Sequence, residues 1–119
     1  MLQSVSLMIG SNKPQELAAF YEKVLGKPAD YADKGWFGFQ IGAIFLSIGE
    51  HSEVKETAQE PQRMMLNFET PDVEKEFERI KTLGATVIKE PYSMEGGMIA
   101  TFADVDGNYF QLMPPWKSM

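Results

Sequence analysis

Histidine and cysteine, which often carry acid–base, nucleophilic and zinc chemistry, are almost absent from this sequence. There is one histidine and no cysteine, which excludes disulfides, thiolate nucleophiles and cysteine-based zinc sites. His51 stands beside Glu50, Ser52 and Glu53, where it is either a general base or metal ligand, or an exposed loop histidine. Glu69 is either a base that also attracts a cation, or the solvated end of a strand. No catalytic residue is assigned from these patterns.

Two aspartates near the C-terminus have a spacing that calcium loops and tight turns share. Asp104 and Asp106 precede Gly107, but the third acidic position and the later glutamate of an EF-hand are absent. The apolar runs Met98–Ala103 and Tyr109–Met113 flank them, and an Asp-Gly pair tolerates the positive φ of a hairpin turn. The stretch is therefore predicted to be a β-hairpin.

The first half of the chain predicts a strand, a helix and three further strands. Residues Ser4–Ile9 alternate as a half-buried strand does. Apolar residues at helical spacing predict a helix over Lys13–Leu25, with Asn12 as its N-cap. The strands expected after it are Ala29–Ala32, Trp36–Ile41 and Ala43–Ile48, the last two forming a hairpin closed near Gly42.

The same order of elements returns after a polar loop. The loop is Glu50–Gln62, and a strand is expected after it over Met64–Glu69. The helix that follows is opened by Thr70, Pro71 and Asp72 and ended by Gly84. The remaining expected elements are a strand over Ala85–Lys89, a loop over Glu90–Gly97 and the final hairpin. Pro14 and Phe20 recur as Pro71 and Phe77. We therefore expect one domain of two repeated modules, residues 1–58 and 62–119.

Strand alternation sorts the side chains into a core face and a second face. The second face carries Ser4, Ser6, Met8, Phe45, Ser47, Met65, Asn67, Tyr109, Gln111 and Met113. If the sheets of the two halves curve together, these side chains line the inside of a cup. A neutral, partly apolar lining suits an organic ligand. The alternatives are a second hydrophobic core or a dimer interface.

The composition excludes several classes of partner. The net charge is −6 and no basic block is present, so nucleic acid is not expected to bind. No apolar stretch approaches the ~20 residues that cross a bilayer, and the first residues lack the pattern of a signal peptide. We expect a cytoplasmic protein without a membrane partner. The acidity either favours a cationic ligand or only keeps the protein soluble.

The paired βαβββ order resembles the vicinal-oxygen-chelate superfamily, which includes glyoxalase, the extradiol dioxygenases and the fosfomycin- and bleomycin-resistance proteins. The resemblance rests on Phe20-Tyr21, Leu25-Gly26 and the stretch Asp104–Asn108, and it extends from Val5 to Met113. It implies an α+β fold of two paired βαβββ modules, with a curved, mostly antiparallel sheet around a cup-like cavity. It also implies a homodimer.

Enzymes of that superfamily hold a divalent metal through His, Glu or Gln on four strands. The matching positions in this chain are Ser6, Phe45, Met65 and Gln111. Of these only Gln111 is a plausible ligand, and it is uncharged, whereas divalent ions require several oxygen, nitrogen or sulfur donors. The resemblance therefore implies no metal and no cofactor, and it is nearest to the bleomycin-resistance-like branch.

We accordingly predict a metal-free protein that sequesters an organic ligand, cationic or aromatic, such as an antibiotic or a metabolite. The expected ligand-binding residues are Ser6, Met8, Trp36, Phe45, Met65, Asn67, Tyr109, Gln111 and Met113, with Trp116 as a further aromatic contact. The alternatives are a divergent metal-dependent lyase or dioxygenase of the glyoxalase type, and a structural domain with a collapsed cup.

Overall fold

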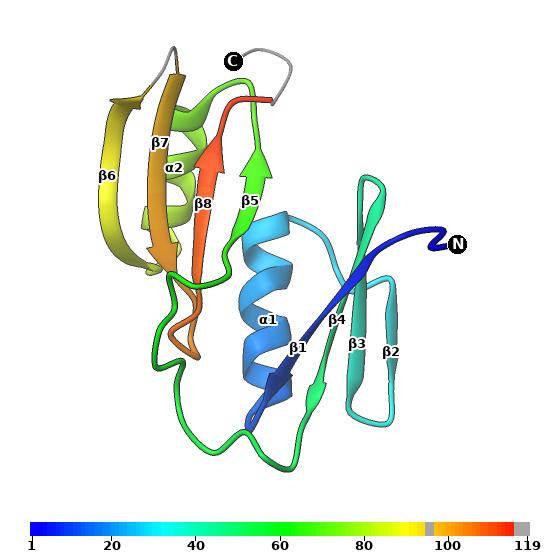
Figure 1. The fold of residues 1–119 in the computed structure, drawn as a ribbon. Helices are drawn as coiled ribbons and strands as arrows, with labels where there is room; N and C mark the ends of the chain where they lie inside the picture. Colours follow the sequence, from blue (N-terminus) through cyan, green and yellow to red (C-terminus); the bar gives the residue numbers. More distant parts are fainter. Residues whose placement is uncertain (95–96, 116–119) are drawn as a thin grey trace. The chain divides into compact units, whose positions relative to one another are not determined.

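A computed structural model describes residues 1–94 and 97–115 of the chain, which divides into two compact units, Met1–Glu56 and Thr57–Met119 (Figure 1). Each unit is described by itself. The first contains β1 (Ser6–Ser11), α1 (Pro14–Leu25), β2 (Tyr31–Asp33), β3 (Trp36–Ile41) and β4 (Ile44–Glu50). The second contains β5 (Leu66–Glu69), α2 (Val73–Thr82), β6 (Thr86–Met94), β7 (Gly97–Ala103) and β8 (Tyr109–Met113). The predicted α+β fold of two βαβββ modules is confirmed.

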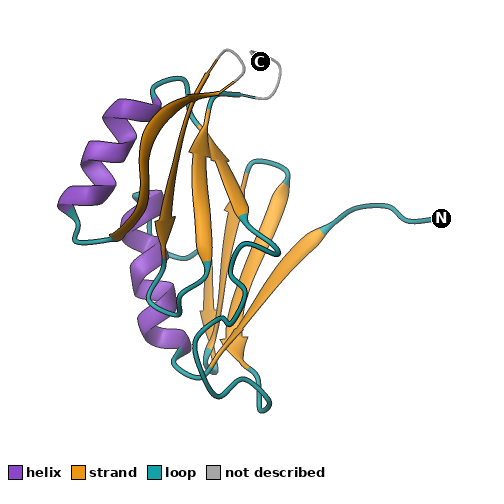
Figure 2. Ribbon diagram, turned by 60° about the vertical axis from the view of Figure 1, so that its left-hand side comes forward, coloured by secondary structure: helices purple, strands orange, loops and turns teal. Residues whose placement is uncertain are grey.

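Each unit forms a four-stranded mixed sheet with the same topology. The strand orders are β1-β4-β3-β2 and β5-β8-β7-β6. The first and last strands of each unit, β1 with β4 and β5 with β8, pair in parallel, and the other pairs are antiparallel. In each unit the helix covers one face of its own sheet (Figure 2). We call the other face of each sheet its helix-free face.

The core of each unit lies between its helix and its sheet. In the first unit Leu17 and Tyr21 of α1 are fully buried, as are Phe39, Leu46 and Ile48 of the sheet. In the second unit the rings of Phe77 and Phe102 stack with centroids 5.2 Å apart, and the rings of Phe102 and Phe110 stack at 5.5 Å. These residues have the spacing that the sequence predicts for core faces.

Both helix starts differ from their predictions. Helix α1 has Lys13, not Asn12, at its N-cap, and the buried hydroxyl of Ser11 accepts a hydrogen bond from the Lys13 N–H (2.9 Å). Asn12 instead donates to the carbonyl of Lys55 (3.0 Å). Helix α2 is capped by Asp72, whose Oδ1 accepts from the Lys75 N–H (3.1 Å), so Pro71 lies outside the helix.

Two strands of the second unit also differ from their expected bounds. Strand β5 begins at Leu66, which leaves Met65 before it. Strand β6 extends to Met94, although Glu90–Gly97 was predicted to be a loop; residues 95 and 96 of that stretch lie outside the described residues. The strand accommodates Pro91 because it is an edge strand with register shifts on both sides of Lys89. In the described residues no helix is long and apolar enough to cross a membrane.

The Asp104–Asn108 turn closes the final hairpin, as predicted. Oδ1 of the buried Asp104 accepts from the backbone N–H groups of Asp106 and Asn108, each at 2.9 Å. The Asn108 side-chain amide donates to both Asp104 oxygens, at 3.2 and 3.0 Å, and Gly107 has a φ of +83°. Both oxygens of this carboxylate are therefore committed to the turn, which favours the hairpin interpretation over a calcium loop.

Replacing Asp104 by alanine should destabilise the protein strongly. The Asp104→Ala variant leaves the N–H groups of Asp106 and Asn108 without their acceptor, and we expect a loss of about 2–4 kcal/mol in the free energy of unfolding, measured with urea. Val105→Ala, in the same turn but exposed, is the control and should change stability by less than about 0.5 kcal/mol. Equal effects of the two substitutions would contradict this role.

Candidate ligand-binding faces

The helix-free face of the first unit is built by the ladder between β1, β4 and β3. Ser6 pairs with Phe45, and Met8 pairs with Ser47, which in turn pairs with Gly38 of β3. Partners across a ladder point to the same face of a sheet, so these side chains share the face away from Leu46 and Ile48. Phe45 and Ser47 are half-buried there, and Met8 is exposed.

Two rings lie across glycines on this face. A Cβ at Gly38 would overlap the ring of Phe45, and a Cβ at Gly49 would overlap the indole of Trp36. Neither glycine has a positive φ. Their lack of a side chain therefore provides room for a ring rather than a special backbone conformation. Because Phe45 belongs to β4 and Trp36 to β3, each ring covers a glycine of the neighbouring strand.

The outer part of this face is also aromatic and carries a negative charge. Tyr31, the ladder partner of Gly38, is 52% exposed, and Trp36 is 39% exposed. Asp33 is the ladder partner of Trp36, because the Lys34-Gly35 turn between β2 and β3 has a positive φ at both residues. A carboxylate thus lies directly across the ladder from an exposed indole.

His51 lies at one end of the same face. A Cβ at Gly10 of β1 would be 2.9 Å from the His51 Cβ, which places this exposed side chain beside the ladder pair Gly10 and Gly49. The Nδ1 atom of His51 accepts a hydrogen bond from the Glu53 N–H (3.1 Å). The histidine is therefore an exposed loop residue, which is the second of the two interpretations given from the sequence. It also borders the face that carries Trp36.

A charged pair holds the edge of this sheet together. Asp30 Oδ2 accepts from Lys27 Nζ and from the backbone N–H of Gln40, each at 2.7 Å. The hydrogen bond from Lys27, followed by that from Gln40, lowers the pKa of the Asp30 carboxyl below its ordinary value. The carboxylate therefore links the loop after α1 to β3.

The helix-free face of the second unit has a different, polar character. Asn67 pairs with Gln111, Gln111 with Thr101, and Thr101 with Lys89. Gln111 Nε2 donates to Thr101 Oγ1 at 3.4 Å. On one side of this polar row Glu69 pairs with Met113, which is only 6% exposed. On the other side of the row Tyr109 pairs with Ala103. This face has hydrogen-bonding groups where the first unit has rings.

The predicted ligand-binding residues thus divide into two sets. Ser6, Met8, Trp36 and Phe45 come together on the first unit, and Asn67, Tyr109, Gln111 and Met113 on the second. Met65 lies outside the ladder, and Trp116 lies outside the described residues. The sequence reasoning missed Gly38, Gly49, Thr101 and Lys89. A glycine inside each of two neighbouring strands was the available signal for the ring contacts.

The residues at the superfamily's metal positions do not fit a divalent ion. Ser6 pairs with Phe45, and Gln111 pairs with Asn67, so these ladder pairs provide a hydroxyl and two neutral amides. Met65 adds only a thioether. Within residues 1–94 and 97–115 no group of three or more His, Cys, Asp and Glu side chains is arranged to hold a metal ion. Hard divalent ions require more oxygen donors than this, carboxylates among them.

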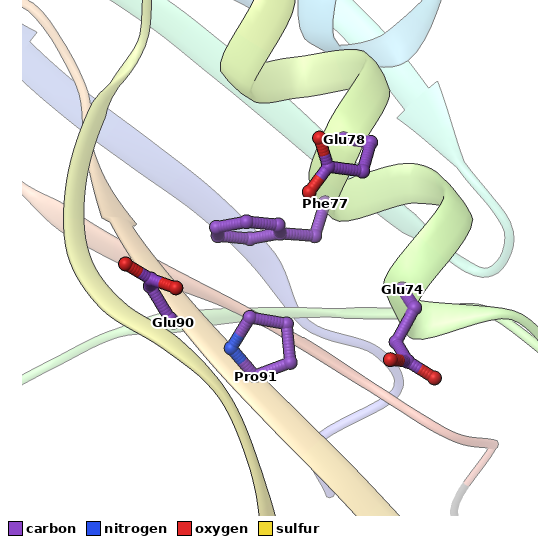
Figure 3. A pocket seen from close by; sticks show the side chains of 5 residues that line it. All are labelled: Glu74, Phe77, Glu78, Glu90 and Pro91. Carbon is purple, nitrogen blue, oxygen red and sulfur yellow. The ribbon is translucent and has the colours of Figure 1, made fainter.

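A separate pocket of about 300 Å³ lies between α2 and β6 of the second unit (Figure 3). It is lined by Glu74, Phe77, Glu78, Glu90 and Pro91. The carboxylates of Glu78 and Glu90 lie on either side of the Phe77 ring and that of Glu74 points away from it, so the three do not converge on one point. This pocket is on the helix side of the sheet, so it is not part of the predicted ligand-binding face.

The chain belongs to the glyoxalase-like domain family, whose model matches residues 6–113. No curated protein matches it in sequence. Among solved structures it is similar to a hypothetical protein from S. aureus, with 25% identity and a TM-score of 0.78 over 97% of this chain and 95% of that one. A glyoxalase/bleomycin resistance protein from Albidiferax ferrireducens T118 is 21% identical, with a TM-score of 0.74 over 92% and 96% of the two chains. The fosfomycin resistance protein FosX from Mesorhizobium loti is 21% identical, with a TM-score of 0.65 over 97% and 92%.

Alanine at Gly49 should be tolerated only when the indole above it is removed. We expect Gly49→Ala to destabilise the protein by about 1–3 kcal/mol, because the new methyl group overlaps Trp36. In a Trp36→Ala background the same substitution should be neutral or stabilising by up to about 1 kcal/mol, since alanine is favoured over glycine in a strand. Urea unfolding followed by circular dichroism measures the free energy of unfolding of the parent, of each single variant and of the double variant. Strict additivity of the two substitutions would show that the ring does not rest on Gly49.

Proposed function

We propose that this glyoxalase-like protein binds a small organic ligand on the helix-free face of its first unit, without a metal ion. One observation carries the proposal: where superfamily enzymes place metal ligands, Ser6 and Phe45 are ladder partners, and Phe45 belongs to a surface of rings. The position is thus suited to contact with an apolar or aromatic molecule and unsuited to coordination. Binding requires no bond to be made or broken.

The side chains of this face have complementary roles in such binding. Trp36 and Phe45 offer large rigid surfaces, and Met8 is an adaptable apolar contact. Ser6 and Ser47 lie beside them and can orient a polar group of the ligand. Few polar groups within a mainly apolar lining are typical of small-molecule sites.

The charge of the chain favours a ligand that is cationic as well as aromatic. The net charge is −6, and Asp33 lies across the ladder from Trp36. A cation above an indole face is attracted by the ring, and the neighbouring carboxylate adds to that attraction. We infer a stoichiometric capture of such a molecule, an antibiotic or a metabolite, by a cytoplasmic homodimer. The resistance functions named for the A. ferrireducens and M. loti proteins are compatible with capture, although their similarity to this chain concerns the fold.

A planar organic cation tests the proposal directly. We expect N-methylquinolinium to raise the thermal unfolding temperature saturably and to quench Trp36 fluorescence in a Trp116→Phe variant. Trp36→Ala should weaken binding about tenfold, in line with the energy of a stacked cation. Leu83→Ala, which removes an exposed apolar side chain of the second unit, is the matched control and should bind as the parent does.

Two comparison compounds separate the contributions to binding. Naphthalene-2-sulfonate has a similar planar shape with a negative charge, and tetraethylammonium has the charge without the ring; both should bind more weakly than N-methylquinolinium. No saturable response to any of the three compounds, or an equal response in Trp36→Ala, would refute the proposal.

A further inference from the structure

A row of four polar side chains crosses the helix-free face of the second unit from one edge strand to the other. Each strand contributes one residue, and each residue is the ladder partner of the next: Asn67 of β5, Gln111 of β8, Thr101 of β7 and Lys89 of β6. Direct partners lie on the same face with Cβ atoms about 5 Å apart. The side chains therefore form one continuous polar line.

The hydrogen-bonding capacity of this row is largely unused. Within the described part of the chain, the only hydrogen bond among these side chains runs from Gln111 Nε2 to Thr101 Oγ1, at a long 3.4 Å. Thr101 is only 6% exposed, and its hydroxyl proton has no acceptor among the described residues. Buried polar groups in proteins are usually satisfied. A hydroxyl in this position is therefore suited to donate to a bound molecule.

Lys89 adds a positive charge at one end of the row. Its Nζ lies 5.2 Å from the centroid of the Tyr92 ring, and it makes no ion pair with any described residue, although the chain is strongly acidic. The register of β6 shifts on both sides of Lys89. Such bulges redirect side chains, and here Lys89 is the ladder partner of Thr101.

We infer that this row is a binding site for the carboxylate group of a small molecule. The Lys89 ammonium and the Thr101 hydroxyl belong to ladder partners and provide a charged and a neutral donor on neighbouring strands, and the amides of Gln111 and Asn67 extend the donor row. Glu69 would repel an anion, but it lies one row away on β5, at the opposite edge of the sheet from Lys89. The carboxylate therefore binds at the Lys89–Thr101 end.

This site is distinct from the aromatic site proposed above, because it lies in the other unit. Its charged group is the cationic Lys89 and its ligand is an anion, whereas the aromatic site takes a cation. Charge-assisted hydrogen bonds are stronger than neutral ones, so Lys89 should dominate the affinity. The isosteric change Thr101→Val removes the hydroxyl, both as a donor to the ligand and as the acceptor of the Gln111 amide. The ring stack of Phe77, Phe102 and Phe110 lies on the opposite face of the sheet from Thr101.

Titration with benzoate, followed by ¹H–¹⁵N NMR, tests this inference. We expect saturable shifts of the side-chain amide signals of Asn67 and Gln111 and of the backbone signal of Thr101. Benzylammonium, which has the same ring and the opposite charge, should leave these signals unchanged. Lys89→Met should weaken benzoate binding about tenfold, and Thr101→Val several-fold.

Lys81 provides a matched control for Lys89. Its Nζ also lies over a ring, 5.9 Å from the centroid of Phe77, but it belongs to α2 on the helix side of the sheet. Lys81→Met removes the same charge and should leave benzoate binding unchanged. If Thr101→Val does not fold, the pair of lysine variants still decides the question, because Lys89 is exposed.

Three results would overturn the inference: no saturable benzoate shift in the row, the same affinity in Lys89→Met as in the parent, or equal losses in Lys89→Met and Lys81→Met. None of them depends on the response of Trp36 to N-methylquinolinium. The carboxylate site and the aromatic site can therefore fail separately.

Discussion

The parallel ladder between the first and last strands of each unit is the constraint on which the rest of this structure depends. Because side chains alternate along a strand, the register of β1 with β4 places Leu46 and Ile48 beneath α1 and Phe45 and Ser47 on the opposite face. A slip of one residue in β4 would bury Ser47 and expose Leu46. The same rule in the second unit separates Phe110 from Gln111. Burial of the core therefore fixes which residues can meet a ligand.

The fold supplies positions, and the side chains at these positions decide the chemistry. This chain shares the glyoxalase-like fold, yet its residues at the metal positions of the superfamily are a hydroxyl, a ring, a thioether and an amide. In the first unit Ser6 and Phe45 accompany rings that lie over Gly38 and Gly49. In the second unit Gln111 belongs to a line of polar donors. Rings held against a rigid sheet lose little freedom on binding, which supports the proposal of a planar ligand.

Much of the fold could be predicted because its signals are local. Helical spacing from Leu17 to Val24, alternation from Leu66 to Glu69 and the Asp104–Asn108 turn each depend on residues close in sequence. The helix caps were less predictable, because several neighbouring polar residues are equally good caps. At α1 both Ser11 and Asn12 could cap the helix start, and it is the Ser11 hydroxyl that accepts a hydrogen bond from the Lys13 N–H.

The parts of the site that were missed depend on distant pairings. Strand β6 continues past Pro91 because an edge strand with bulges tolerates a missing N–H, and no short-range pattern reveals this. Lys89 therefore looked like the end of a strand rather than a member of a polar row. Likewise, the contact of Trp36 with Gly49 needs the register of β3 with β4, which spacing along the chain does not provide.

Metal content tests most directly whether these faces bind organic molecules rather than ions. Protein purified without chelators from medium containing zinc, nickel, iron and manganese would be analysed by elemental mass spectrometry, and its thermal unfolding compared with and without EDTA. We predict far less than one metal ion per chain and an unchanged unfolding temperature. Close to one ion per chain, lost together with stability on chelation, would contradict the proposal.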